Sequence, residues 1–448
     1  MKTLLLTIDA WRATHASFMP DAVGEHTPNL AALAEEGAVF SQAVSHGPAT
    51  PYAFPSIFTS TLPLDYGGYE QLSDERTLVS EALHEAGWSA AGVHANPWLG
   101  EKYGYGRGYD IYRDVGEFGL PGLERGRQFL LDNFSLDSPV YRAAQSLYRT
   151  VQEPLRMLGG DAAEIEVARK ALDESSDETF VWTHLLEPHA PYTPPKRHRE
   201  AVGVPETDAT PSQLVTRAQH GPEEFTERER EVVRGLYAAS VRHADEKAGK
   251  LLEAVDDDTL VIVTADHGEA LFEHGQVGHE PALYDELTHV PLLVRPPGGA
   301  AEGLVETQAR HLDIAPTVLD YAGVEPPESY RGRSLRPAVE GEGMSDEVAI
   351  SEVASSATEP GRLAPEELQV AARTPARKLI HADGEVRGFD LQNDPEEREP
   401  IADPKGDDWD DLRAALDDRL AAIEVGETED IERDEEVQER LRNLGYID

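Results

Sequence analysis

A short apolar run that leads into an acid and an imidazole is the feature that most constrains this chain. Residues 260–263 are aliphatic and mostly β-branched, and Asp266, His267 and Gly268 follow closely. Such a run predicts a strand buried on both faces of a parallel sheet. Ligands bind outside the carboxyl ends of strands in open α/β sheets. The pattern therefore favours half of a divalent-cation site, and a polar turn in which Asp266 caps a helix is the alternative.

A second apolar run stands at the start of the chain and also ends in an acid. Residues 3–8 are mostly aliphatic, and Asp9 follows directly. If both runs are central parallel strands, Asp9 and Asp266 emerge at the same edge of the sheet. Two carboxylates beside an imidazole would repel or stay unsatisfied without a cation between them. Taken alone, Asp9 could equally cap the next helix; the pair predicts a metal site.

Several motifs in this chain follow the order of one known family over nearly the whole length. They include Leu6-Thr-Ile-Asp-Ala-Trp-Arg12 and Thr264-Ala-Asp-His-Gly-Glu269. Each is modest by itself, but together they resemble the sulfatase branch of the alkaline phosphatase superfamily, in a soluble, haloarchaeal type. The remaining motifs lie at residues 48–60, 184–192, 273–275, 278–279, 284–294, 311–317 and 389–396.

The resemblance implies an α/β fold with an alkaline phosphatase-like, mostly parallel central sheet flanked by helices. Residues 1–334 would form the catalytic domain, with residues 117–175 as a helical, cap-like insert. Residues 335–448 would form a small C-terminal α+β subdomain with an acidic helical tail. Short strand-like segments with turns between them predict that its sheet is antiparallel.

The resemblance also implies roles for individual residues. Asp9, Asp266 and His267 would bind one divalent cation, which could be manganese, zinc, magnesium or calcium. Many sulfatases carry a second aspartate after the first, and Ala10 in its place suggests a single-cation site of mixed oxygen and nitrogen ligands. The cation would polarise the oxygens of a bound ester.

Four further polar residues are expected around the ester. His189 and His279 match positions that contact ester oxygens or assist the leaving group, a task that suits an imidazole with a near-neutral pKa. His184 and Asn96 are weaker candidates for substrate binding. Taken singly, each histidine could also be a loop residue that only forms hydrogen bonds.

Ala53 is a departure from the family pattern. The family nucleophile, or its formylglycine precursor, lies two residues before a Pro-Ser pair, which here is Pro55-Ser56. Three interpretations remain open. Thr50 or Ser56, in a rigid loop at residues 47–55 that leads into a helix, could replace the nucleophile. A metal-bound hydroxide could attack directly. The protein could also bind an ester or glycan without turnover.

Composition excludes several classes of function. The chain has no cysteine, which excludes disulfides, cysteine zinc sites and a cysteine-derived formylglycine. Its 85 acidic against 40 basic residues give a net charge of −45, which disfavours nucleic acid and suggests adaptation to high salt. We see neither a signal peptide nor a membrane span and expect a cytoplasmic protein.

These observations predict a metal-dependent hydrolase of sulfate or phosphate esters that acts on a small polar or glycan ester. A phosphoryl or phosphoglycerol-type transferase on the same fold is one alternative. A catalytically inactive binding homologue is the other, and Ala53 is the reason for it. The sequence does not indicate the oligomeric state.

Overall fold

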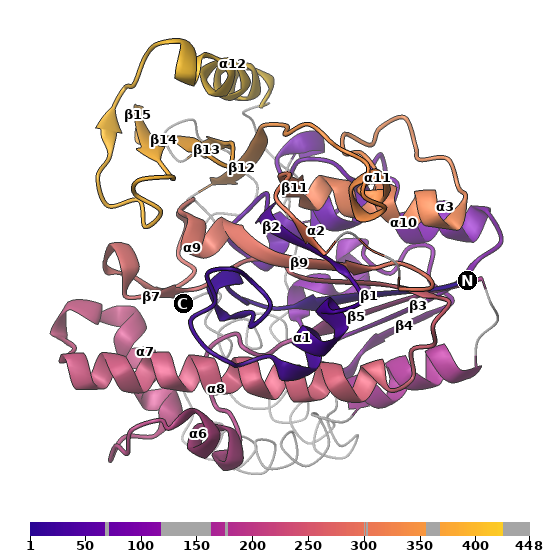
Figure 1. Cartoon of the computed structure of the whole chain (residues 1–448), viewed down its shortest axis with the longest axis horizontal. Coiled ribbons are helices and arrows are strands. Elements are labelled where there is room, and N and C mark those ends of the chain that lie inside the picture. Colours follow the sequence, from indigo (N-terminus) through magenta and orange to yellow (C-terminus); the bar gives the residue numbers. More distant parts are fainter. Residues whose placement is uncertain are drawn as a thin grey trace, which may run out of the picture.

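A nine-stranded mixed sheet runs through the centre of the computed structural model (Figure 1). The structure describes residues 1–67, 71–117, 163–174, 178–299, 301, 303–354 and 368–423. The strands lie in the order β10 (Leu304–Val305), β2 (Ala38–Val44), β9 (His289–Arg295), β6 (Thr259–Ala265), β1 (Lys2–Ile8), β5 (Thr179–Leu185), β3 (Ser89–His94) and β4 (Ile111–Asp114), and β11 (Ala309–Arg310) also pairs with β2.

The two apolar runs of the sequence are adjacent strands at the centre of this sheet. β1 pairs in parallel with β6 on one side and with β5 on the other, and Ile8 stands opposite both Ala265 and Leu185. All seven residues of β6 are buried, as a strand covered on both faces requires. Asp9 and Asp266 therefore leave the sheet at the same edge, as the sequence predicted. Only β9 runs antiparallel to its neighbours, β2 and β6, among the described strands of this sheet.

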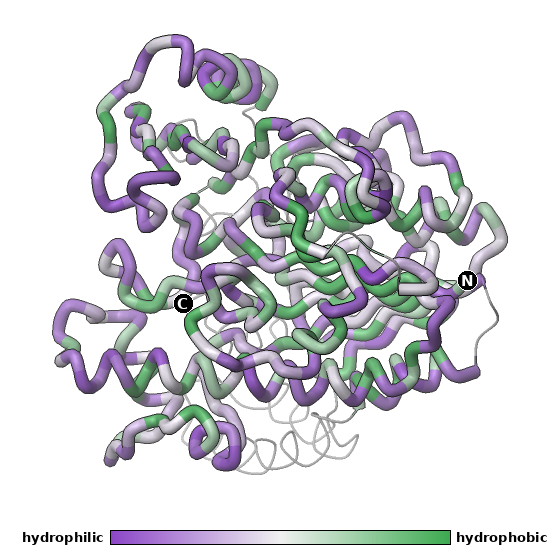
Figure 2. The backbone as a smooth tube through the Cα atoms, in the orientation of Figure 1, coloured by the Kyte–Doolittle hydropathy of each residue, from purple (hydrophilic) through white to green (hydrophobic). Residues whose placement is uncertain are grey.

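Helices cover both faces of the sheet (Figure 1). The 26-residue helix α8 (Glu227–Leu252) lies along one face, and α1, α6 and α7 contact it. Helices α2, α3 and α10 lie on the other face. Figure 2 shows the apolar residues concentrated in the strands and the hydrophilic residues on the outer helices. The helices besides α8 and α12 are α1 (Pro28–Ala34), α2 (Thr50–Thr59), α3 (Val79–Glu85), α6 (Lys196–Val202), α7 (Pro211–His220), α9 (Asp285–Thr288), α10 (Ile314–Ala322) and α11 (Arg336–Val339).

A second, antiparallel sheet follows near the C-terminus and packs under helix α12 (Asp407–Ala422). Arg419 of α12 forms buried ion pairs with Glu352, in the same unit, and with Asp65, and the pair with Asp65 ties this unit to the first part of the chain. The two sheets confirm the predicted fold class. The strands of the second sheet are β12 (Ala349–Ala354), β13 (Leu368–Arg373), β14 (Arg377–Ala382), β15 (Glu385–Asp390) and β16 (Ile401–Ala402).

Helix α2 begins earlier than the sequence predicted. We expected a proline-rich loop up to residue 55, but the helix starts at Thr50. Pro51 lies in the first turn, where the absent N–H would have no partner within the helix in any case. Pro55 lies inside the helix, so three prolines in nine residues gave a misleading loop signal.

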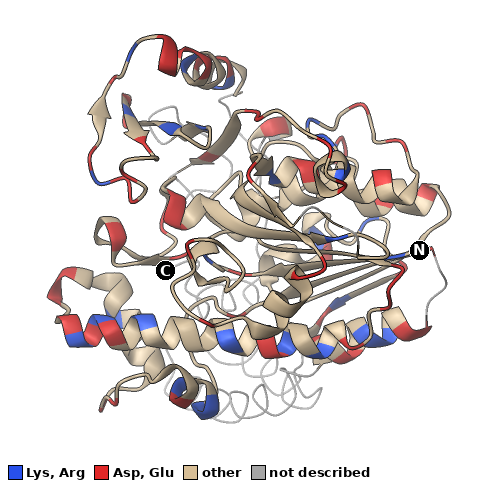
Figure 3. Cartoon of the chain, viewed as in Figure 1, with Lys and Arg blue, Asp and Glu red and all other residues tan. Residues whose placement is uncertain are grey.

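Two predicted segments fall mainly outside the described residues. Of the expected insert at 117–175, the structure describes residue 117 and residues 163–174, and the latter are helical. Of the acidic tail, it describes the helix that ends at Ala422. Figure 3 shows acidic residues spread over the outer helices, α8 and α12 among them. None of the helices in the described part of the chain combines the length and apolar character needed to cross a membrane.

Candidate functional site

Two strand-end acids and one histidine form a buried cluster at the edge of the central sheet. One ligand atom each from Asp9, His184 and Asp266 lies within 4.8 Å of the others, and none of the three side chains is exposed. His184 Nε2 lies 3.1 Å from Asp9 Oδ2, and its Nδ1 lies 2.9 Å from the Thr7 hydroxyl. Burial opposes ionisation of Asp9, but His189, His184 and His267 outweigh it and hold its pKa well below the usual range. The sequence gave His184 a substrate-binding role, whereas the structure brings it among the acids.

The backbone around the cluster is held in unusual conformations. Ala10, directly after Asp9, has a left-handed φ of 56°, a strained conformation for a residue with a side chain. Its N–H donates to Asp266 Oδ1 at 3.2 Å, and its carbonyl accepts from the Tyr237 hydroxyl at 2.7 Å. These two hydrogen bonds, to Asp266 and from Tyr237 of α8, fix the turn that follows Asp9.

Gly268 makes room for a close backbone approach on the other side of the cluster. Its N–H donates to the Leu287 carbonyl at 2.8 Å, and the N–H of Glu269 donates to the Glu286 carbonyl at 2.9 Å. A Cβ on Gly268 would lie 2.0 Å from the Glu286 carbonyl oxygen. Only glycine fits here, and it sets the path of the backbone from Asp266 to Glu269.

His267 supplies an observation that favours a cation at this place. Its Nδ1 donates to the Gly268 carbonyl at 2.7 Å, which directs Nε2 toward the acids. Nε2 faces both carboxylates, 3.4 Å from Asp9 Oδ1 and 3.7 Å from Asp266 Oδ2. Burial lowers the pKa of His267, but the charges of Asp266 and Asp9 outweigh it and raise the pKa to about 9. Buried carboxylates with imidazole nitrogens between them are a donor set that fits a divalent cation.

Thr50, at the first position of α2, faces the same acids. Its hydroxyl donates to Asp266 Oδ2 at 2.8 Å, and the Asn96 amide donates to the Thr50 oxygen at 3.2 Å and to Asp9 Oδ2 at 2.9 Å. Thr50 and Asn96 are fully buried. The helix N-terminus adds a favourable field for negative charge at this point. Thr50 and Asn96 thus belong to the cluster.

Ala53 and Ser56 lie elsewhere on the same helix. Ala53 is fully buried and belongs to the main hydrophobic core. The Ser56 hydroxyl is buried and donates to the Thr61 carbonyl at 2.9 Å, at the C-terminal end of α2. Of Thr50 and Ser56, the two candidate hydroxyls on this helix, the one that contacts the cluster is therefore that of Thr50.

Three imidazole rings line up beside the cluster. The His267 and His279 ring centres are 4.6 Å apart, and those of His279 and His189 are 4.8 Å apart. His189 Nδ1 donates to the Ala190 carbonyl at 2.7 Å. Burial lowers the pKa of His189, and burial together with His267 lowers that of His279 to about 3. The structure thus brings together the two histidines that the sequence placed at the ester.

Glu269 is the site residue that our sequence interpretation left without a role. It is fully buried, and its Oε1 lies 3.4 Å from His279 Nδ1. Burial raises its pKa to about 7, although His189 and His267 lower it in part. A carboxyl group that titrates near neutral pH beside an imidazole can take part in proton transfer. Its place at the end of the motif 264–269 was the sequence signal that could have identified Glu269 as a site residue.

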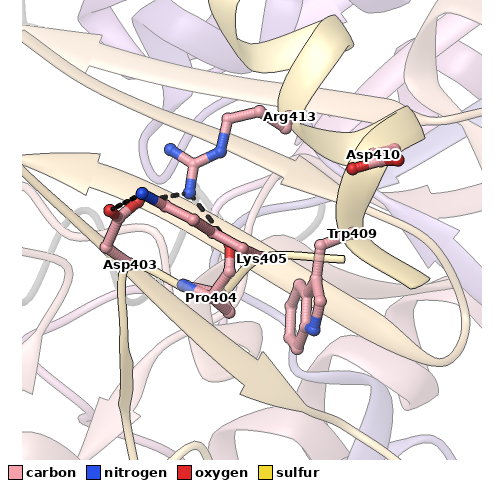
Figure 4. A pocket seen from close by; sticks show the side chains of 6 residues that line it. All are labelled: Asp403, Pro404, Lys405, Trp409, Asp410 and Arg413. Atoms are coloured by element: carbon pink, nitrogen blue, oxygen red, sulfur yellow. Dashed lines mark hydrogen bonds and ion pairs between the residues drawn. The ribbon is translucent and has the colours of Figure 1, made fainter. Parts of the chain in front are cut away.

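A surface pocket of about 380 Å³ lies in the C-terminal unit and is lined by residues between 403 and 413 (Figure 4). Asp403 accepts from Arg413 at 2.7 Å and pairs with Lys405 at 3.1 Å, so the charges of this pocket neutralise one another. Its lining residues are Asp403, Pro404, Lys405, Trp409, Asp410 and Arg413.

The α/β fold and the buried Asp9, His184 and Asp266 cluster fit the class of enzymes that hydrolyse sulfate or phosphate esters with a divalent cation. The chain belongs to the sulfatase family: the family model "Sulfatase" matches residues 2–324. A second model, "N-sulphoglucosamine sulphohydrolase, C-terminal", matches residues 273–426. Family membership and fold support a hydrolase of sulfate or phosphate esters.

Individual relatives agree with this assignment. A choline-sulfatase of Rhizobium meliloti is 25% identical over 473 residues, which cover 96% of this chain and 90% of that protein. Arylsulfatase K of Bos taurus is 37% identical over 119 residues, which cover 25% of this chain and only 22% of that protein. The structure of a phosphonate monoester hydrolase of Agrobacterium radiobacter superimposes with a TM-score of 0.67 at 20% identity, covering 94% of this chain and 95% of that one. This last likeness shows the shared fold.

Proposed function

We propose that this chain is a metal-dependent hydrolase of sulfate or phosphate esters in which Thr50 is the nucleophile. Small polar or sugar esters are the proposed substrates. Supporting this class, the relatives include a choline-sulfatase, and a structural relative is described in complex with its substrate D-glucosamine-2-N,6-O-disulfate. The observation that carries the choice of nucleophile is the hydrogen bond from Thr50 to Asp266 Oδ2.

We propose Asp9, Asp266, His184 and His267 as the metal ligands. A bound divalent cation would neutralise charge on the ester oxygens and lower the pKa of a nearby hydroxyl. The mixed carboxylate and imidazole set suits manganese, zinc, magnesium or calcium, and elemental analysis of the purified protein identifies which. Cysteine is absent, so the reaction needs a nucleophile other than formylglycine.

In the proposed reaction, the Thr50 hydroxyl gives its proton to Asp266 Oδ2, with which it already shares a hydrogen bond. The oxygen attacks sulfur or phosphorus while the bond to the leaving alkoxide breaks. Glu269, whose pKa of about 7 leaves part of its carboxyl protonated at neutral pH, supplies the proton that the alkoxide takes up, and His189 or His279 passes it on. Water then attacks the threonine ester and gives one proton back to Glu269 through the same histidines, while Asp266 returns its proton to the Thr50 oxygen as sulfate or phosphate leaves.

Replacement of the candidate hydroxyls tests this proposal on a panel of chromogenic sulfate, phosphate and phosphonate esters in high salt. Thr50→Val keeps the shape but removes the oxygen, and it should reduce kcat by about 10³-fold or more, whereas Thr50→Ser should retain activity. Ser56→Ala is the matched control on the same helix and should change kcat by no more than about 3-fold, since its hydroxyl contacts only backbone.

Two outcomes would reject the proposal. If Thr50→Val retains most of the wild-type rate, water attacks the ester without a threonine intermediate. If wild type turns over no ester while metal stays bound, the chain is a binding protein.

A further inference from the structure

A buried lysine on α8 lies between two acids outside the cluster described above. Lys247 Nζ is 2.6 Å from Glu164 Oε1 and 2.7 Å from Glu187 Oε2. Lys247 is 4% exposed and Glu164 2% exposed. Removing one partner of so well buried an ion pair leaves an uncompensated charge, so the geometry of the three groups is strongly coupled.

The two acids come from different parts of the chain. Glu164 lies in the helical segment 163–174. Glu187 lies just after β5, two residues before His189. The Lys247 and His243 charges outweigh the effect of burial and lower the pKa of Glu187 to about 2, whereas burial raises that of Glu164. Lysine thus holds an ionised carboxylate on the segment that carries His189.

The segment between Leu186 and Tyr192 is attached to its surroundings at several points. The His189 N–H donates to the Leu186 carbonyl at 3.0 Å, which closes a turn. The Tyr192 ring lies 5.4 Å from the ring of Tyr237, another residue of α8. Tyr237 also donates to the turn after Asp9. Helix α8 therefore contacts both the turn after Asp9 and the segment that carries His189.

We propose that Lys247 is a positioning residue: through Glu187 it fixes the segment 186–192 and thereby the place from which His189 reaches the ester. The inference rests on the proposed hydrolase function. It assigns Glu187 a role that Glu164 lacks, although both acids bind the same lysine, at 2.7 and 2.6 Å. This difference makes the inference testable.

The test compares Glu187→Gln with Glu164→Gln as a matched control. Each keeps the side-chain shape and leaves Lys247 its other acid partner among the described residues, whereas Lys247→Met would leave two buried acids without this lysine and lose the fold. We expect Glu187→Gln to lower kcat on alkyl esters, which need a proton for their leaving group, by about 10-fold or more, with KM little changed. Aryl esters with good leaving groups should lose less than about 3-fold, and Glu164→Gln should stay within about 3-fold on both.

Hydrogen exchange gives a readout that does not depend on turnover. Glu187→Gln should reduce protection in the peptide 186–192, and Glu164→Gln should reduce it only in 163–174. If wild type hydrolyses no ester, the proposed function fails, and this exchange pattern alone decides the positioning role. Equal kcat losses in the two variants, or unchanged protection of 186–192 in Glu187→Gln, would overturn it.

Discussion

Gly268→Ala should disable the site although it adds only one methyl group. The new Cβ would lie 2.0 Å from the Glu286 carbonyl oxygen and 2.9 Å from its carbon. Cβ contacts essentially do not occur below 3.0 Å, so the backbones must separate by about 1 Å. Both are held by hydrogen bonds of 2.8 and 2.9 Å across this contact, which the shift would break or stretch.

The displaced backbone carries His267 on one side and Glu269 on the other. A misplacement of about 1 Å at reacting groups can cost about 10²-fold in rate, so we expect kcat/KM to fall by at least that factor. Overpacking of this kind also costs about 1–3 kcal/mol of the free energy of unfolding. Metal affinity should weaken as well, because His267 no longer faces the two acids at its present distances.

Steady-state kinetics, metal titration and thermal melts measure these effects. Gly343→Ala is the control, since a Cβ there meets nothing within 4 Å and its φ is not in the left-handed region. The control should match wild type in all three assays. Wild-type kinetics and metal affinity in Gly268→Ala would show that the close approach to Glu286 does not set the geometry of the site.

Three further predictions concern metal, salt and pH. Wild-type protein should hold about one divalent cation per chain and Asp266→Ala none; retention of metal in this folded variant would exclude Asp266 as a ligand. The melting temperature should fall steeply between molar salt and about 0.1 M, where the Debye length reaches roughly 10 Å, because the net charge is −45; a flat profile would contradict adaptation to salt. The pKa of Glu187 is lowered from 4.5 to about 2, so its ion pair stabilises the fold above pH 4.5 and is lost as pH falls through 2. The stability gap between wild type and Glu187→Gln, measured by denaturant titration, should therefore be wide at pH 6 and close toward pH 2; a gap independent of pH would refute this linkage.

The α2 segment shows where local sequence misleads. Prolines at 51 and 55 indicate a loop, but the packing of this segment in the core outweighs their low helix propensity. The helix therefore starts at Thr50 and not after residue 55. That shift puts the Thr50 hydroxyl on Asp266 and the Ser56 hydroxyl on Thr61. Sequence alone could not choose between these two hydroxyls, because the choice depends on which face of a helix meets the sheet edge.

The sequence by itself determined the fold class and the meeting of Asp9 with Asp266. The fold class follows from the resemblance of the motifs to one family. The meeting of the two acids follows from periodicity, because two buried apolar runs favour central parallel strands, and the residues that follow such strands lie at a common edge of the sheet. Only the tertiary structure decided which other groups join them. His184 and Thr50 come from two separate segments, and the signals for their convergence are long-range strand register and helix packing. No local pattern indicates the position of Lys247, since a lysine in a polar helix is expected to face solvent. The fold instead buries it between two acids.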